Sequence, residues 1–148
     1  MNNQPVVILL AEDDPDDQYL ISEAFDESGM TTQLSIVEDG DELLDYLFRR
    51  GKFTDTDKWL RPTLILLDLN MPRKDGREAL AEIKAHPELR RIPVVVLTTS
   101  QAEEDILRTY DLGVSGFITK PVKFSGLLEI MKSLSSYWLN TVALPPSE

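Results

Sequence analysis

Several residue types and segments are missing from this chain of 148 residues, and each absence excludes a class of protein. There is no cysteine, which excludes disulfide bonds and thiolate metal sites and is typical of a cytoplasmic protein. No apolar run approaches the roughly 20 residues that span a bilayer. The start, Met1–Pro5, lacks the basic region that opens a signal peptide.

Histidine and basic residues are scarce as well. The one histidine, His86, directly precedes Pro87 at an expected helix end, so we expect it to face solvent rather than act as a base or metal ligand. Lys and Arg number 15 against 26 Asp and Glu, a formal net charge of −11. That charge opposes binding to nucleic acid and to anionic membranes, and we expect neither as a partner. The composition therefore predicts a soluble, acidic, single-domain protein of the cytoplasm.

Apolar runs of strand length alternate along the chain with longer segments of helical period. This alternation predicts an α/β fold of five β/α units, with a parallel sheet and helices on both faces. The expected strands are Val6–Ala11, Gln33–Val37, Thr63–Leu67, Val94–Leu97 and Gly116–Thr119.

Capping residues predict where the helices begin. The expected starts are Asp14-Pro15, Asp39-Gly40, Asp75 with Glu78 as a capping box, Ser100 with Glu103 as a second box, and Phe124, whose helix runs to Leu139. The apolar face expected for the second helix comprises Leu43, Leu44, Leu47 and Phe48. The segment Gly51–Arg61, with Phe53 and Trp59, is expected to be a loop that is long for its position.

Polar residues with reactive or ligating side chains follow four of the expected strands. The strand ends lead into Glu12-Asp13, Asp68, Thr98 and Lys120. Because parallel strands of an open α/β sheet place their sites at the carboxyl edge, we expect these groups to converge there. Acids, a hydroxyl and a lysine together indicate a site for a divalent metal and a phosphoryl group.

The three acids Glu12, Asp13 and Asp68 would repel one another if packed bare. A hard cation such as Mg²⁺, which prefers oxygen ligands, removes that conflict, and the backbone carbonyl of Asn70 is placed to join them. Asp68 is the expected nucleophile, since a carboxylate can form an acyl phosphate. Lys120 and Thr98 would then bind phosphoryl oxygens.

Each of these residues also has an ordinary structural interpretation. Asp68 alone would more often be a turn residue after a strand, Thr98 a β-branched strand residue, and Lys120 a solvated charge. Asp16 and Asp17 we assign to the first turn of the first helix, where the helix dipole favours acids. The functional interpretation is favoured because the remaining candidates all lie at the ends of four expected strands.

At these residues the chain resembles the receiver domain of two-component response regulators, over roughly residues 6–139. The matching motifs are Glu12-Asp13, Leu67-Asp68-Leu69-Asn70-Met71-Pro72, Thr98 and Lys120-Pro121. The resemblance implies a flavodoxin-like sheet of order 2-1-3-4-5, a tail over residues 140–148, and no output domain. It also implies a regulator that is not an enzyme beyond its own phosphorylation and slow dephosphorylation.

The same resemblance assigns roles to the site residues. Asp68 would accept a phosphoryl group from a phosphohistidine of a sensor histidine kinase, with Mg²⁺ or Mn²⁺ held by Glu12, Asp13, Asp68 and the carbonyl of Asn70. The Lys120-Pro121 bond would be cis. Thr98 and Phe117 would form the switch that alters the face built from helix 4, strand 5 and helix 5.

Within the family, the segment Gly51–Arg61 and the ending Tyr137-Trp138-Leu139 are similar to stand-alone regulators associated with phytochromes. This implies a bacteriophytochrome-type kinase as partner. Leu127, Met131, Leu134 and Trp138 form one helical stripe that can pack on the sheet, and the apolar residues left over favour a homodimer. The alternative is that Tyr137–Leu144 folds back over the domain. Thr99, where many receivers carry a smaller residue, leaves the dephosphorylation rate open.

Three other functions share parts of this pattern. A flavodoxin-like FMN carrier would need a phosphate-binding loop after the first strand, but Glu12-Asp13-Asp14 would repel an anion. An aspartyl phosphatase would need a general acid where Asn70 stands. A DNA-binding regulator would need basic charge and a helix-turn-helix, and the residues after Leu139 supply neither.

Overall fold

The computed structural model describes residues 6–27, 32–71, 75–98 and 113–119, together with residues 111 and 125. Its centre is a five-stranded parallel sheet of order β2-β1-β3-β4-β5. The strands are β1 Val6–Ala11, β2 Thr32–Val37, β3 Leu64–Asp68, β4 Val94–Thr98 and β5 Gly116–Thr119. The predicted fold and strand order are thus confirmed, with strand ends that differ from prediction by one residue at most.

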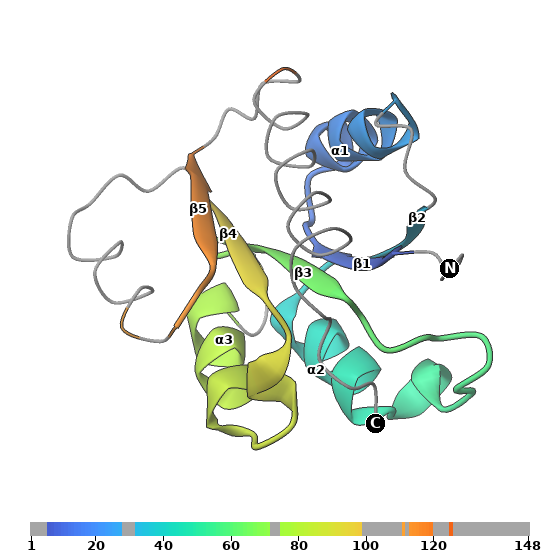
Figure 1. The fold of residues 1–148 in the computed structure, drawn as a ribbon, viewed down its shortest axis with the longest axis vertical. Helices are drawn as coiled ribbons and strands as arrows, with labels where there is room; N and C mark the ends of the chain where they lie inside the picture. Colours follow the sequence, from blue (N-terminus) through green and yellow to red (C-terminus); the bar gives the residue numbers. More distant parts are fainter. Residues whose placement is uncertain are drawn as a thin grey trace, which may run out of the picture.

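Helices cover both faces of this sheet (Figure 1). α1 (Pro15–Glu27) lies on one face, and α2 (Gly40–Phe48) and α3 (Gly76–Ala85) lie on the other. Two short 3₁₀ helices, η1 (Gly51–Phe53) and η2 (Leu89–Arg91), follow α2 and α3 along the chain. The helices expected from Ser100 and over Phe124–Leu139 fall almost wholly outside the described residues.

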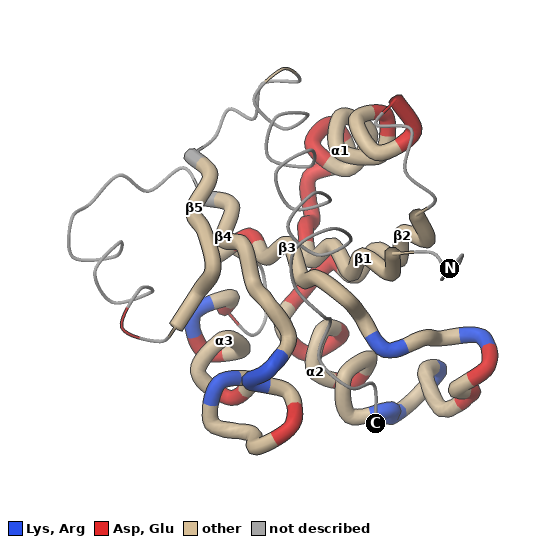
Figure 2. The backbone as a smooth tube through the Cα atoms, in the orientation of Figure 1, with Lys and Arg blue, Asp and Glu red and all other residues tan. Residues whose placement is uncertain are grey.

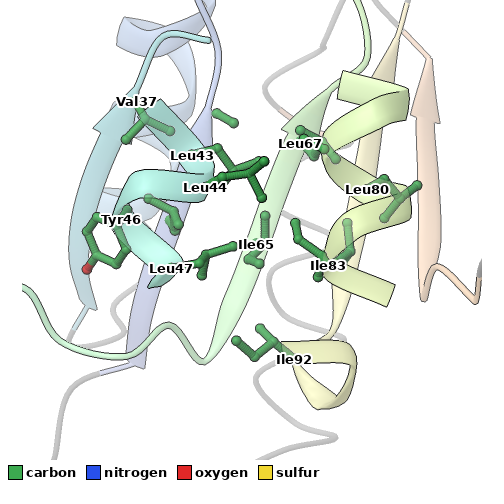
Figure 3. Close-up of a cluster of buried hydrophobic side chains, with 14 of the residues drawn as sticks. Val37, Leu43, Leu44, Tyr46, Leu47, Ile65, Leu67, Leu80, Ile83 and Ile92 are labelled. Atoms are coloured by element: carbon green, nitrogen blue, oxygen red, sulfur yellow. The ribbon is translucent and has the colours of Figure 1, made fainter. Parts of the chain in front are cut away.

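The alternation of side chains along each strand divides the core in two. Leu9, Ile65 and Val96 belong to the cluster beneath α2 and α3, and this larger cluster is shown in Figure 3. Their strand neighbours, such as Leu10 and Leu66, belong to the cluster beneath α1. Because β1, β3 and β4 are buried on both faces, their sequences are continuous apolar runs rather than alternating ones.

Aspartate side chains cap the three helices at the predicted positions. Asp14 accepts from the Asp16 N–H at 2.9 Å, Asp39 from Glu42 at 2.7 Å, and Asp75 from Arg77 at 2.7 Å. Because the Asp75 carboxylate binds the second amide of α3, its cap differs from the capping box expected with Glu78. These caps fix the entry of each helix just after the carboxyl edge of the sheet.

The segment Gly51–Arg61, predicted to be a long loop, begins with η1 and packs against the core, which was not predicted from the sequence. Phe53 is buried, and its ring lies 5.1 Å from that of Tyr46 and 5.0 Å from that of Trp59. The Tyr46 hydroxyl donates to the Leu60 carbonyl at 2.6 Å, and Arg49 donates to the Trp59 carbonyl at 2.6 Å. The segment is therefore a packed extension of the core.

Two further side chains lie elsewhere than expected. Phe48, predicted on the apolar face of its helix, is 36% exposed. It ends α2 beyond the core, where Arg50 lies over its ring and the His86 ring meets it edge-on. His86 is half-buried rather than solvent-facing. Its Nδ1 accepts from the Glu88 and Leu89 amides at 3.1 and 3.2 Å, so the imidazole holds the turn into η2.

We expect Tyr46→Phe to lower the free energy of unfolding by about 1 kcal/mol at neutral pH, because it removes the bond to Leu60. Burial raises the pKa of Tyr46 above its usual 10.0 and outweighs the lowering by Ser35 and Arg49. The folded state therefore holds the phenol proton more tightly than the unfolded chain does. The contribution of the Tyr46 hydroxyl to the free energy of unfolding is therefore fully present below the pKa of the unfolded state. It is lost as pH rises through the pKa of the folded state.

Urea unfolding at neutral and alkaline pH measures both effects. The stability difference between the wild type and Tyr46→Phe should shrink above about pH 10. Tyr19→Phe is the control, because Tyr19 is 67% exposed and should show little difference at either pH. A Tyr46→Phe difference that stays constant from pH 7 to strongly alkaline pH would contradict the assignment.

Candidate metal and phosphoacceptor site

The acids predicted at the ends of two strands lie together. Glu12 and Asp13 directly follow β1, Asp68 ends β3, and these strands are parallel neighbours with Ala11 opposite Leu67. One carboxylate oxygen from each acid lies within 4.8 Å of the others. Glu12 and Asp68 are buried, at 0% and 3% exposure, whereas Asp13 is exposed. The cluster therefore has a buried floor and one side open to solvent.

Backbone hydrogen bonds fix the chain that carries Glu12. Its N–H donates to the Val37 carbonyl at 2.9 Å, which continues the pairing of β1 with β2. Its Oε2 accepts from the Asp14 N–H at 3.1 Å, and its carbonyl accepts from Gln18 Nε2 at 2.7 Å. Gln18 was not singled out in the sequence, and no motif there marks it. The residue is thus held at three points before any ligand binds.

Asp68 is held in a comparable way. Its Oδ1 accepts from the Asn70 N–H at 3.0 Å, and the next residue, Leu69, donates to the Leu97 carbonyl at 3.1 Å. Gly76 at the start of α3 donates to the Leu69 carbonyl at 3.1 Å. These bonds tie the turn after β3 to both β4 and α3, and they set the direction of the Asp68 carboxylate.

The donor set fits a divalent metal. Three carboxylates within this distance repel one another, and two of them are screened from water, so a cation among them relieves a cost that burial makes larger. All the donors are oxygens, which hard cations such as Mg²⁺ prefer, and the exposed Asp13 leaves room for bound waters. The three acids that were proposed from the sequence as metal ligands therefore lie together, as expected.

The charge distribution around the site also favours a bound cation. Half of the 26 acids, and none of the 15 Lys and Arg, fall within the first 48 residues. Acids mark the chain from the end of β1 into α1, while Lys and Arg of the described residues gather around α3 and the segment after α2 (Figure 2). An anion approaching the site meets negative potential unless a cation is bound.

The other predicted site residues are described only in part. Thr98 ends β4 opposite Thr119 of β5, at the same edge of the sheet as Asp68, but its side chain lies outside the described residues. Phe117 of β5 is half-buried and packs against the larger core cluster. Lys120, Pro121 and the predicted cis bond between them also lie outside the described residues.

Comparison with known proteins finds a matching family and similar proteins. Residues 8–132 match the family model of the response regulator receiver domain. Response regulator Rcp1 of the cyanobacterium Synechocystis is 45% identical over 144 residues, which is 97% of this chain and 96% of Rcp1. No helix among the described residues combines the length and apolar character that crossing a bilayer requires.

Solved structures give the same result. The phosphorylated cyanobacterial phytochrome response regulator RcpA is 47% identical and superposes with a TM-score of 0.83, covering 97% of this chain and all of RcpA. The Mn²⁺-bound form of Rcp1 has a TM-score of 0.81 at 45% identity over 96% of this chain and all of that one. A response regulator in red light signalling of R. palustris has a TM-score of 0.85 at 34% identity, covering 97% and 99% of the two chains.

Proposed function

The chain belongs to the response regulator receiver domain family of two-component signalling, and from this membership we propose that Asp68 is its phosphoacceptor. The observation that carries the proposal is the position of Asp68. It ends a buried strand beside two further acids, with its carboxylate directed by the Asn70 N–H. It occupies the place that the sequence motif Leu67–Pro72 assigns to the acceptor.

The transfer needs one bond to form and one to break. An oxygen of the Asp68 carboxylate forms a bond to phosphorus, and the bond between phosphorus and the phosphohistidine nitrogen of a sensor kinase breaks. The departing imidazole keeps the electron pair. The product on this chain is an acyl phosphate, which stores the energy for a change of conformation.

Mg²⁺, or Mn²⁺ in its place, would be held by Glu12, Asp13, Asp68 and the backbone carbonyl of Asn70, and would neutralise the charge that gathers during transfer. A related regulator was solved in its Mn²⁺-bound form, which supports this assignment. Within the chain, Glu12 is the buried, fixed member of the set and Asp13 the exposed one. Their combined charge favours a cation over a bare phosphate.

The remaining roles follow the family pattern. Lys120 and Thr98 bind phosphoryl oxygens, and Thr98 and Phe117 transmit the change to the face built from helix 4, strand 5 and helix 5. Only contacts that differ between the two states can shift such an equilibrium, and the phosphoryl contacts of Lys120 and Thr98 supply them. Residues 6–139 form the receiver domain and residues 140–148 a tail.

The partner we propose is a sensor histidine kinase of the phytochrome type, in the cytoplasm. Relatives described as phytochrome and bacteriophytochrome response regulators, matched over nearly the whole chain, support this assignment. The protein acts as a regulator, with no activity beyond its own phosphorylation and slow dephosphorylation. A homodimer through the last helix completes the proposal, although almost all residues of that helix lie outside the described part of the chain.

The function is tested with acetyl phosphate as a small phosphoryl donor and intact-mass spectrometry. With Mg²⁺ we expect one phosphoryl adduct per chain, and with a chelator none, because the acids need a cation before an anion can approach. Hydroxylamine should remove the adduct, since it attacks the activated carbonyl of an acyl phosphate but leaves phosphate esters intact. An adduct that forms under chelation, or that survives hydroxylamine, would overturn the proposal.

A further inference from the structure

Gln18 connects α1 to the backbone of the metal-site acids. Its Nε2 donates to the Glu12 carbonyl at 2.7 Å and lies 3.3 Å from Oε2 of Glu38, the residue that follows β2. The carbonyl belongs to the peptide that joins Glu12 to Asp13. A single amide group therefore touches the link between two of the three clustered acids.

The orientation of this amide follows from chemistry alone. A backbone carbonyl and an ionised carboxylate are both acceptors, so only the NH₂ end of Gln18 can face them. Its two N–H groups are then divided between the two acceptors. The backbone of Glu38 is itself anchored, because its N–H donates to Glu42 Oε1 at 2.8 Å. Glu38 thus directs the Gln18 amide toward Glu12.

The consequence is a fixed Glu12–Asp13 peptide. The carbonyl of this peptide accepts from Gln18, so rotation of the peptide would break that bond. The preceding peptide is held separately, because the Glu12 N–H donates to the Val37 carbonyl. The orientation of that peptide determines where the Asp13 side chain leaves the backbone. Mg²⁺ demands near-ideal octahedral geometry, so small displacements of its ligands weaken binding.

We propose that Gln18, oriented by Glu38, is a positioning residue for the metal-binding acids. The inference rests on the proposed function, in which Glu12 and Asp13 bind Mg²⁺. Gln18 touches neither metal nor phosphoryl group and acts through the Glu12 carbonyl. Groups that orient metal ligands in this way commonly contribute tenfold or more to metal affinity.

The first test is Gln18→Met, which keeps the length and helix-forming character of the side chain but removes both donors. Calorimetric titration with Mg²⁺ should show a dissociation constant raised roughly tenfold. At saturating Mg²⁺, the initial rate of phosphorylation by acetyl phosphate should return to within about twofold of wild type, because the bound metal then holds the acids in place. A residue that only packs α1 on the sheet would instead lower the metal-free melting temperature without changing Mg²⁺ affinity.

Two variants of Glu38 separate the hydrogen bond from the charge. Glu38→Gln and Glu38→Met both remove one negative charge, but only Glu38→Gln keeps an oxygen that can accept from Gln18. We expect Glu38→Met to bind Mg²⁺ several-fold more weakly than Glu38→Gln, and no further loss when Gln18→Met is added to Glu38→Met. Tyr19→Ala, which alters the exposed neighbour of Gln18 on the same helix, should leave Mg²⁺ affinity unchanged.

Asp13→Asn distinguishes failure of this inference from failure of the proposed function. Wild-type Mg²⁺ affinity in Gln18→Met, with weakened affinity in Asp13→Asn, would overturn the positioning role and keep the metal site. Equal affinity of the two Glu38 variants would overturn it as well. Unchanged affinity in Asp13→Asn would instead count against the metal site itself.

Discussion

Asp68→Asn is expected to reduce the phosphoryl adduct to background with acetyl phosphate and Mg²⁺, the largest functional effect that we expect from one substitution. The amide is uncharged and its nitrogen lone pair is delocalised, so it offers no nucleophile to phosphorus, although its shape fits the site. Its oxygen can still accept the Asn70 N–H that now binds Asp68 Oδ1 at 3.0 Å. The variant should therefore lose the chemistry while keeping the fold.

The same variant should be more stable than wild type without metal. Removing one of three clustered carboxylates relieves like-charge repulsion, which at 4.8 Å and an effective dielectric constant of 20 is about 3 kcal/mol per pair before solvent screening reduces it. With Mg²⁺ the stability difference between the variant and wild type should shrink or reverse, because the bound metal stabilises wild type more. Thermal unfolding with and without Mg²⁺ measures both changes.

Asp75→Asn is the matched control for Asp68→Asn. Asp75 lies in the same connection that Asp68 enters from β3, but its carboxylate caps α3 and pairs with Arg77 at 3.3 Å. This control should keep the adduct and lose up to about 1 kcal/mol of stability. An adduct retained by Asp68→Asn but lost by Asp75→Asn would mean that the acceptor has been misassigned.

The fold was predictable because its strongest signals are local. β1, β3 and β4 are buried on both faces, so each appears in the sequence as an unbroken apolar run. Aspartates at the helix starts then mark where each run gives way to a helix. The edge strand β2 is only partly buried, and its predicted start differs from the observed one by one residue.

The position of the site was predictable from the order of the strands in the sheet. Once parallel strands are neighbours, the residues after β1 and β3 must meet at one edge, and this rule places Glu12, Asp13 and Asp68 together. No periodicity or motif, however, encodes the direction in which each carboxylate points. That direction depends on the Asn70 and Asp14 amides, which donate from turns.

Contacts between distant side chains were the part that sequence reasoning missed. Gln18 and Glu38 are 20 residues apart, and only the pairing of β1 with β2 brings them together. Tyr46 and Trp59 meet because the segment after α2 folds back, which begins at Arg49 with a φ of 58°. Such packing reflects tertiary complementarity, which neither helical nor strand period records.

Gly76→Ala is expected to have the largest effect on stability. A Cβ at Gly76 would lie 2.4 Å from the Asp68 carbonyl oxygen and 2.7 Å from the Leu69 Cα. Both neighbours are backbone atoms, so no side chain can rotate away, and either α3 or the turn after β3 must move. We expect a loss of about 2–4 kcal/mol, although alanine favours a helix over glycine by roughly 1 kcal/mol.

The displacement should also reach the metal site, because the atoms in the way belong to the residue that carries the proposed acceptor and to its neighbour. A melting temperature lower by roughly 10 °C, together with weaker Mg²⁺ binding and slower phosphorylation even at saturating Mg²⁺, is the expected result. The slow phosphorylation at saturating Mg²⁺ separates this variant from Gln18→Met, whose phosphorylation rate should recover under that condition. In Gly76→Ala the carbonyl of Asp68 itself is pushed, so metal cannot restore the original geometry.

Gly116→Ala provides the matched control for this substitution. Gly116 begins β5, and a Cβ there would meet only the Val95 methyl groups at 3.6 and 3.9 Å, which is ordinary contact. It should therefore change stability by less than about 1 kcal/mol and leave Mg²⁺ affinity unaltered. Wild-type stability in Gly76→Ala would show that the start of α3 can move away from Asp68 and Leu69 at little cost. The close approach of α3 would then have no part in holding the proposed phosphoacceptor in place.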